Sequence, residues 1–551
     1  MLISLDVHEK EIAGKKLYRG LSLNLSENEK VGLIGRNGTG KSTLLHIISG
    51  QDKDFDGQVD INKYARIAST RQEHTGLGEL SLVHYILDDL PEFKSLKNTL
   101  DSFHYSDPTA RQLESYSNAL ERFTVLGYFD VESKIREDLK RLQFTAEMID
   151  GKLGSLSGGQ KRLVEVVKIM NSSANIVLMD EPTNHMDHIA KRWFIDWLSS
   201  FEGSALIVTH DRDVLHVVDK IAEIKDLNLK VFKGNYDAYL KQNMHSTVNS
   251  MQDWETTQKS IENLKVKITR NQRLKEKARD PGTIKVFKRL ENEAREELSK
   301  LQLLEKPTFW IDKESSSSLK KEVVGKYEEY KAKNINVQSG DLDSSSIRLL
   351  SIESLSLGYN KEPLFVGLSL DLRSGERQEL RGRNGAGKST LIKSILATSS
   401  NIDFQGKVFG GLIDIHPQTR IGLYEQELED DYLKLNLEEA IRSFYTDIGK
   451  SITDTALRSV LSNYLFDPSK DLHQPVSSLS GGQKARLQLI KMFVGDPNLL
   501  ILDEPTNHLD LPSIEELEEA LKNFAGAILY VSHDTYFRKN IGGEVLEISR
   551  Q

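Results

Sequence analysis

The sequence predicts an α/β protein in which one domain occurs twice and an antiparallel pair of helices joins the two copies. Three patterns occur in the same order in both halves of the 551 residues: GRNGTGKS at 35–42 and GRNGAGKS at 382–389, LSGGQ at 156–160 and 479–483, and DEPTNHMD at 180–187 and DEPTNHLD at 503–510. The copies lie 323 residues apart for the last two patterns and 347 apart for the first, so the first copy holds 24 additional residues.

The composition is typical of a soluble globular protein. The chain is 38% hydrophobic and 28% charged, and no run approaches the ~20 apolar residues of a membrane span. The N-terminal MLISLDVHEKEIAGKK lacks the apolar stretch of a secretory signal. There is no cysteine, which excludes disulfides, thiolate zinc sites and iron–sulfur clusters. These features predict a cytoplasmic protein with no membrane partner and no obligate oligomer.

The repeated glycine loop matches G-x-x-x-x-G-K-[ST], a pattern that binds phosphates when a strand precedes it and a helix follows. In the first copy the apolar VGLI precedes the loop and a helix-like STLLHIISG follows it. Backbone amides and the helix N-terminus then face the phosphates, with the loop lysine on the outer phosphates and the loop serine on magnesium. These residues are Lys41 and Ser42 in the first copy and Lys388 and Ser389 in the second. A glycine-rich turn without a ligand is disfavoured because the pattern occurs twice.

In the second copy the loop follows QELR (378–381), although a buried parallel strand should be almost continuously apolar. Glu379 and Arg381 share one face of this strand because they are two residues apart. We expect them to form a structural ion pair, with each other or with groups nearby, rather than to act in catalysis.

The DEPTNH pattern follows a short apolar run in both copies, IVLM and LLIL, which predicts a buried strand whose end carries two acids. The first acid, Asp180 or Asp503, can hold magnesium through water beside a phosphate loop. The second acid, Glu181 or Glu504, can polarise the attacking water.

A histidine also follows an apolar strand in both copies. His210 and His533 each lie 29 residues after the glutamate. A histidine at a strand end is more often structural, but the identical spacing favours contact with the γ-phosphate. The serine hydroxyl and glycine amides of LSGGQ, at the start of a predicted helix, can form a second anion cradle.

Glycine loop, LSGGQ, apolar strand with Asp-Glu, and histidine in this order resemble the ATP-binding-cassette (ABC) ATPases. The resemblance implies two tandem ABC-type P-loop nucleotide-binding domains with ATP and Mg²⁺ as cofactors. In that family ATP lies between the glycine loop of one cassette and the LSGGQ of the other, so two composite, hydrolysis-competent sites are expected.

The catalytic residues would be Glu181, Glu504, His210 and His533. The magnesium-binding residues would be Ser42, Ser389, Asp180, Asp503 and the glutamines Gln72 and Gln426. The ATP-binding residues would be Gly35, Arg36, Asn37, Gly38, Thr39, Gly40, Lys41, Ser42, Thr43, Gly382, Arg383, Asn384, Gly385, Ala386, Gly387, Lys388, Ser389, Thr390, Tyr359, Gln72, Gln426, Ser157, Gly158, Gly159, Gln160, Ser480, Gly481, Gly482 and Gln483.

One position departs from the family pattern, which commonly stacks adenine on an aromatic residue upstream of the glycine loop. Tyr359 lies 23 residues before Gly382, but the same count from Gly35 leads to Ile12. Tyr18 is nearer but out of register. We therefore expect weaker discrimination between ATP and GTP at the first site.

The TNH that follows DEP in both copies resembles the ABC-F subfamily, twin-cassette proteins that lack membrane domains and act on the ribosome. That resemblance implies the ribosome, tRNA and rRNA as partners, in translation regulation, stall rescue or protection against antibiotics. One alternative is the ATPase subunit of an importer with two fused cassettes, which would need a membrane partner and no basic hairpin. Another is a DNA-repair or chromosome-structure ATPase, which would carry far longer coiled coils or zinc-binding cysteines.

Between the copies, roughly 241–310 reads as two helices separated by the turn signal Asp280-Pro281-Gly282. Trp254, Ile261 and Ile268 recur seven apart in the first helix. The segment 265–289 carries ten Lys/Arg against two acids in a chain of net charge −9. A solvated helix face is the alternative, but concentration of charge at one turn favours RNA phosphates. The candidates for RNA contact are Arg270, Arg273, Lys275, Lys277, Arg279, Lys285 and Lys288.

The predicted domains follow from these features. They are a first ABC domain at 1–240 with an arm insertion at about 85–125, the basic hairpin at 241–310, a polar linker at 311–346, and a second ABC domain at 347–551. In ABC-F proteins the arm touches the ribosome, but here its sequence is not notably basic.

Overall fold

The computed structural model describes residues 1–12, 14–70, 77–103, 109–184, 186–277, 279–302, 347–359, 362–400, 404, 406–425, 428–479, 481–507 and 509–549. The chain divides into two compact units. One comprises Met1–Tyr236 and Ile335–Gln551, and it contains both cassettes; the other is Asp237–Asn334.

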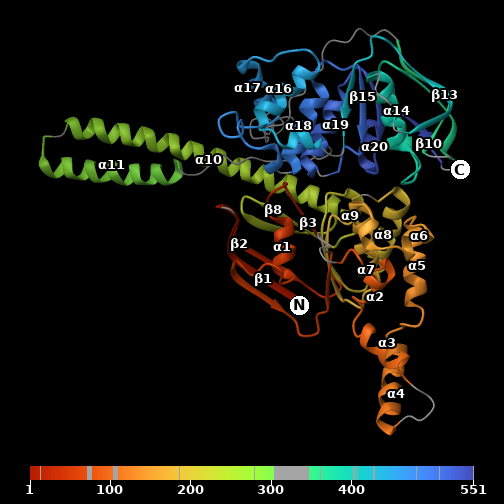
Figure 1. Cartoon of the computed structure of the whole chain (residues 1–551). Coiled ribbons are helices and arrows are strands. Elements are labelled where there is room, and N and C mark those ends of the chain that lie inside the picture. Colours follow the sequence, from red (N-terminus) through yellow and green to blue (C-terminus); the bar gives the residue numbers. More distant parts are fainter. Residues whose placement is uncertain are drawn as a thin grey trace. The chain divides into compact units, whose positions relative to one another are not determined.

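The first cassette is built on a six-stranded sheet (Figure 1). Its order is β5 (Ile67–Ser69), β6 (Ile176–Asp180), β7 (Ser204–Val208), β3 (Lys30–Gly35), β8 (Lys220–Lys225) and β9 (Asn228–Lys233). All neighbours are parallel except β8 and β9. The carboxyl ends of β3, β6 and β7 therefore meet at one edge, where the predicted phosphate and acid residues stand. A three-stranded antiparallel sheet accompanies it: β1 (Ile3–Ile12), β2 (Lys15–Leu25) and β4 (Asp56–Ile61).

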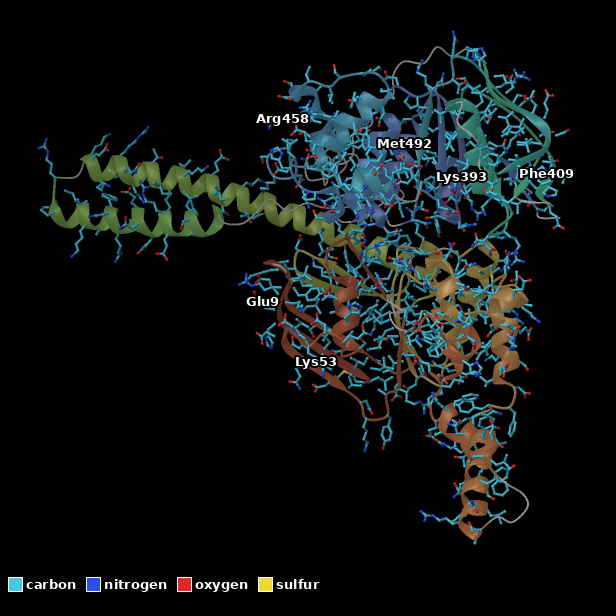
Figure 2. The ribbon with its side chains drawn as sticks, viewed as in Figure 1. Glu9, Lys53, Lys393, Phe409, Arg458 and Met492 are labelled. Carbon is cyan, nitrogen blue, oxygen red and sulfur yellow. The ribbon has the colours of Figure 1, made fainter. Side chains whose placement is uncertain are left out.

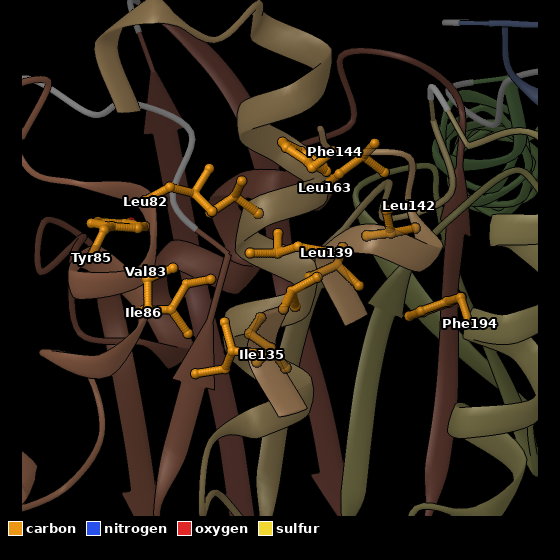
Figure 3. Packing of buried hydrophobic residues seen from close by; sticks show 14 of the residues in the cluster. Leu82, Val83, Tyr85, Ile86, Ile135, Leu139, Leu142, Phe144, Leu163 and Phe194 are labelled. Atoms are coloured by element: carbon orange, nitrogen blue, oxygen red, sulfur yellow. The ribbon is translucent and has the colours of Figure 1, made fainter. Parts of the chain in front are cut away.

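Alternate residues of the central strands belong to two different cores. Ile176 and Leu178 of β6 pack with the core of the antiparallel sheet and α1 (Lys41–Ile48). Val177 and Met179 pack with a second core on the helical side. Figure 3 shows part of this second core, in which Leu139, Leu163 and other apolar side chains converge from separate helices. The helices of this side are α2 (Leu82–Leu87), α5 (Val131–Arg141), α6 (Ala146–Asp150), α7 (Gly158–Asn171), α8 (His188–Ser200) and α9 (Arg212–Leu215).

The predicted arm insertion contains two helices, α3 (Phe93–Asp101) and α4 (Ala110–Val125), which extend from the first cassette (Figure 1). Helix α4 starts with a capping box in which Thr109 and Gln112 satisfy each other's backbone amides. The rings of Phe93 and Phe123 lie 5.7 Å apart at the base of the arm and join it to the apolar core.

The second cassette repeats the strand order of the first, which confirms the predicted duplication of the fold. Its parallel sheet has the order β14 (Ile421–Tyr424), β15 (Leu499–Asp503), β16 (Ala527–Val531), β12 (Arg377–Arg381) and β17 (Glu544–Glu547). Its antiparallel sheet has the order β11 (Glu362–Arg373), β10 (Arg348–Tyr359) and β13 (Lys407–Ile415). Its helices are α14 (Lys388–Ser400), α15 (Asp430–Leu433), α16 (Leu437–Asp447), α17 (Asp454–Asn463), α18 (Gly481–Phe493), α19 (Leu511–Lys522) and α20 (Thr535–Ile541).

The charged strand β12 carries the ion pair that its sequence predicts. The guanidinium of Arg381 lies 2.8 Å from the buried carboxylate of Glu379. Arg538 of α20 adds a second contact to this carboxylate at 3.4 Å. Because both cations compensate the buried charge, the strand keeps its place in the sheet.

The second compact unit contains most of α10 (Tyr236–Lys277) and all of α11 (Pro281–Gln302), which form the predicted antiparallel hairpin (Figure 1). Leu264 and Ile268 pack on Ala294 of the opposite helix. Asp280 accepts hydrogen bonds from the amide and hydroxyl of Thr283, so the DPG signal begins a helix with proline in its first turn. Side chains project from both helices (Figure 2). None of the described helices combines the length and apolarity that crossing a membrane requires.

Candidate active site

Each glycine loop connects a central strand to a helix, as predicted. The ammonium of Lys41 donates to the carbonyls of Gly35 at 2.8 Å and Arg36 at 3.3 Å, so the loop wraps around its own lysine. Lys388 does the same in the second cassette. Gly40 has φ 94°, and a Cβ there would meet the hydroxyl of the buried Tyr18 at 2.5 Å. Only glycine therefore fits this turn.

The serines and aspartates predicted to hold magnesium lie beside the loops. In the second cassette the hydroxyl of Ser389 donates to Asp503 at 2.8 Å. In the first, Ser42 and Asp180 line a cavity of about 410 Å³ together with Lys41 and Glu181. One hydroxyl and one carboxylate beside a phosphate loop suit Mg²⁺, which keeps several positions for water and phosphate oxygens.

Both predicted catalytic glutamates have a left-handed backbone, with φ 46° at Glu181 and 50° at Glu504. This conformation is unusual for glutamate and costs of order 1–3 kcal/mol, so the surrounding structure must impose it. Each carboxylate accepts the backbone N–H of the predicted histidine, at 3.4 Å from His210 and 3.1 Å from His533. The spacing of 29 residues noted in the sequence thus reflects a direct contact.

The environment of these residues sets their protonation at neutral pH. Burial, opposed by the nearby Lys41, raises the pKa of Glu181 to about 8, and burial raises that of Glu504 to about 7. Burial, together with the charge of Lys41, lowers the pKa of His210 to about 3. Burial and the charge of Lys388 likewise lower the pKa of His533 to about 3. Neutral histidines and glutamates that titrate near pH 7 suit a hydrogen-bonding contact and a general base, respectively.

One pair of residues at the site was not predicted. Asp187 and Asp510, the last letters of the two DEPTNH patterns, each cap the helix that follows. Asp187 also accepts the N–H of Asn384 at 3.4 Å, and Asp510 accepts that of Asn37 at 3.2 Å. Each acid therefore contacts the glycine loop of the opposite cassette. The sequence contains a signal for these two residues, because the aspartate occurs at the same position in both copies of the eight-residue repeat.

The LSGGQ segments begin helices α7 and α18, as predicted. Ser157 and Gln160 form a capping box, in which the serine hydroxyl accepts a hydrogen bond from the backbone N–H of Gln160 at 3.3 Å. Among the described residues, the cavity over the first glycine loop is lined by the first cassette alone. Its composite arrangement with the opposite LSGGQ stays a prediction. Gln72, Gln426 and Ser480 lie outside the described residues.

The comparisons with known proteins agree with this geometry. A family model described as ABC transporter matches residues 18–184 and 365–507, and an extension model with the same description matches 222–315. The ATP-binding protein YdiF of Bacillus subtilis is 31% identical over all of this chain and 80% of its own length. The ABC transporter F family member 5 of Arabidopsis thaliana is 28% identical over 99% of this chain and 75% of its own length.

The chain belongs to the ABC-F family of ATP-binding-cassette proteins. This ABC-F protein is accordingly an ATP hydrolase, and its cassettes are of a type that binds ATP, generally with Mg²⁺. Solved structures show the same fold. The archaeal ribosome recycling factor aABCE1, solved with the ribosomal stalk protein aP1, has a TM-score of 0.56 at 17% identity over 98% of this chain and 87% of that one. The RNase-L inhibitor has a TM-score of 0.55 with the same identity and coverage.

The two positions predicted to face adenine, Ile12 and Tyr359, end corresponding strands of the two cassettes. Ile12 ends β1 and pairs with Lys15, whereas Tyr359 ends β10 and pairs with Glu362. Both side chains are exposed, and Ile12 lines the cavity over the first glycine loop. Tyr18 is fully buried and donates its hydroxyl to the carbonyl of Gly40, so it is not placed to stack on a base.

Proposed function

We propose that this ABC-F protein binds the ribosome in an ATP-bound, closed state and leaves it after hydrolysis. ATP held with Mg²⁺ between each glycine loop and the opposite LSGGQ draws the cassettes together, and Glu181 and Glu504 activate the water that attacks it. The hairpin tip then contacts tRNA or rRNA. This activity belongs to translation regulation, stall rescue or protection against antibiotics in the cytoplasm.

The observation that carries the proposal is the basic surface at the hairpin tip. Six of the seven candidate cations are exposed: Arg270, Arg273, Lys277, Arg279, Lys285 and Lys288. Lys275 differs, because it is half-buried and its ammonium lies 2.5 Å from Glu291. Hydrogen bonds from Lys275 and Arg295 lower the pKa of Glu291 to about 2, which keeps the Glu291 carboxylate ionised. Lys275 therefore supports the hairpin, and the six exposed cations are the stronger candidates for phosphate contact.

Two structural neighbours from ribosomal complexes support this proposal. One neighbour is a ribosome recycling factor bound to a ribosomal stalk protein, and another chain comes from a complex of ribosome-bound archaeal Pelota and ABCE1. We further propose the domain division 1–240, 241–310, 311–346 and 347–551, with the arm of α3 and α4 as an additional ribosome contact.

Ribosome co-sedimentation tests this function. The protein with Glu181→Gln and Glu504→Gln should migrate with ribosomes on a sucrose gradient when ATP is present and remain at the top without it. The physical reason is that phosphate contacts persist while the water-activating carboxylates are lost, so the closed state accumulates. Absence of ribosome binding, with bound ATP verified, would contradict the proposal and point to a membrane partner, as for an importer subunit.

Nucleotide selectivity should differ between the two sites. Because stacking of a base on an aromatic ring contributes about 1–3 kcal/mol, Tyr359→Ile should weaken ATP binding at the second site about fivefold or more. Ile12→Tyr should strengthen binding at the first. Binding of ATP and GTP to each variant by fluorescence titration measures both effects. Equal ATP-to-GTP affinity ratios at the two wild-type sites would show that Ile12 does not weaken discrimination.

A further inference from the structure

A central cavity of about 250 Å³ lies where residues of the two catalytic sites approach each other. Its lining includes Glu181 and His210 from one cassette and Glu504 and His533 from the other. Lys191 also lines it. A cation at the boundary between two catalytic sites is in a position to influence both.

Lys191 stands on α8 with its side chain only 7% exposed. Its ammonium lies 2.9 Å from Asp211 and 2.6 Å from Asp213, the two acids that follow His210. A buried ammonium is costly unless paired, and these carboxylates supply the pairing. Their charges, acting against the effect of burial, raise the pKa of Lys191, so it stays protonated.

The same ammonium also reaches the second cassette. It donates to the backbone carbonyl of His533 at 3.4 Å. The backbone N–H of His533 in turn donates to Glu504 at 3.1 Å. Asp213 accepts the hydroxyl of Thr535 at 2.9 Å, which adds a second link between the two histidine loops. A short chain of contacts thus runs from Lys191 through His533 to Glu504.

The residues that make this link are not repeated in the second cassette. With the repeat offset of 323 residues, the counterpart of Lys191 is Ile514, which lines the same cavity. The counterpart of Asp213 is Tyr536, so neither the cation nor its second acid is repeated. The two catalytic sites are therefore connected by hydrogen bonds of one ion-paired lysine and its acid, which the second cassette does not repeat.

We propose that Lys191 is a positioning residue of the opposite site: by holding the His533 loop against the His210 loop, it aligns Glu504 for hydrolysis. The inference rests on the proposed roles of the glutamates and histidines. Through this contact, turnover at the Glu504 site depends on the conformation of the first cassette.

The test uses single-site proteins. In the Glu181→Gln protein the site of Lys191's own cassette is silent, so residual turnover belongs to the Glu504 site. Adding Lys191→Met should lower kcat there about tenfold, the lower end of the effect of losing a hydrogen bond to a charged group, with little change in KM because the glycine loop is intact. Lys191→Arg should restore much of the rate. Ile514→Met at the repeat-related position is the matched control and should lower kcat less.

The expected and the contrary result differ in which single-site protein loses turnover. An unchanged kcat in the Glu181→Gln protein, with a loss confined to the Glu504→Gln protein, would reduce Lys191 to a support of its own loop and overturn the inference. Equal thermal unfolding midpoints of the Lys191→Met and parent proteins exclude misfolding as the cause of a loss, and Lys191→Gln, which also removes the charge, carries the test if Met unfolds the chain. Ordinary turnover by the double Glu→Gln protein would instead refute the proposed glutamate roles, and the inference with them.

Discussion

Replacing Glu181 and Glu504 together with glutamine should lower ATP turnover by at least about 100-fold, the lower end of what a general base contributes. Glutamine keeps the shape of the side chain but cannot accept a proton from the attacking water. Its amide oxygen can still accept the hydrogen bond that the backbone N–H of His210 or His533 donates to the glutamate. The loss should therefore appear in kcat, measured by phosphate release, while ATP still binds. Changing the exposed Glu121 and Glu147 to glutamine is the matched control.

The single variants add a pH dependence with a defined sign. A carboxylate acts as a base only when deprotonated, so activity should be low below its pKa and rise as pH passes through it. The Glu504→Gln protein keeps Glu181, whose pKa is about 8, and its kcat/KM should rise with a midpoint near that value. The Glu181→Gln protein keeps Glu504 and should rise near pH 7. Profiles that are flat from pH 5.5 to 9 in both proteins would mean that other groups activate the water.

Changing the six exposed candidate cations of the hairpin to glutamine should weaken ribosome binding and make it less sensitive to salt. Each phosphate contact that is lost should reduce the slope of log affinity against log salt concentration by about 0.7 to 0.9. Sedimentation in the ATP-bound state across a range of potassium concentrations measures this slope. Lys275 is left unchanged, because its pairing with Glu291 stabilises the hairpin.

A matched charge change elsewhere distinguishes a local surface from general attraction. Lys53, Lys63 and Lys470 are exposed lysines outside the hairpin, and Lys53 is labelled in Figure 2. Changing these three to glutamine should alter the slope less than changing three hairpin cations, Arg270, Arg273 and Lys277. Equal slopes for the two triple variants would show that the hairpin tip is not the RNA contact.

The sequence was most informative where chemistry depends on local backbone geometry. The loop that we propose presents Lys41 to phosphates needs a strand, glycines and a helix within a dozen residues, and that information is contiguous. The ion pair of Glu379 and Arg381 was also predictable, because residues two apart on a strand share a face. The hairpin was predictable from its apolar spacing and its turn signal, because both patterns also lie within short stretches of the sequence.

Contacts between distant segments were decided by the tertiary structure. Three contacts join different elements of the fold. They are the hydrogen bond of Asp187 with Asn384, the ion pair of Lys275 with Glu291, and the hydrogen bond from Lys191 to His533. No short pattern encodes them, because a side chain's partners depend on how strands and helices pack together. The strand–loop–helix form and the order of the two glycine loops were thus predictable from the sequence itself. Which acid or cation completes each site was settled only by packing, since charges act over a few ångströms in space regardless of their separation along the chain.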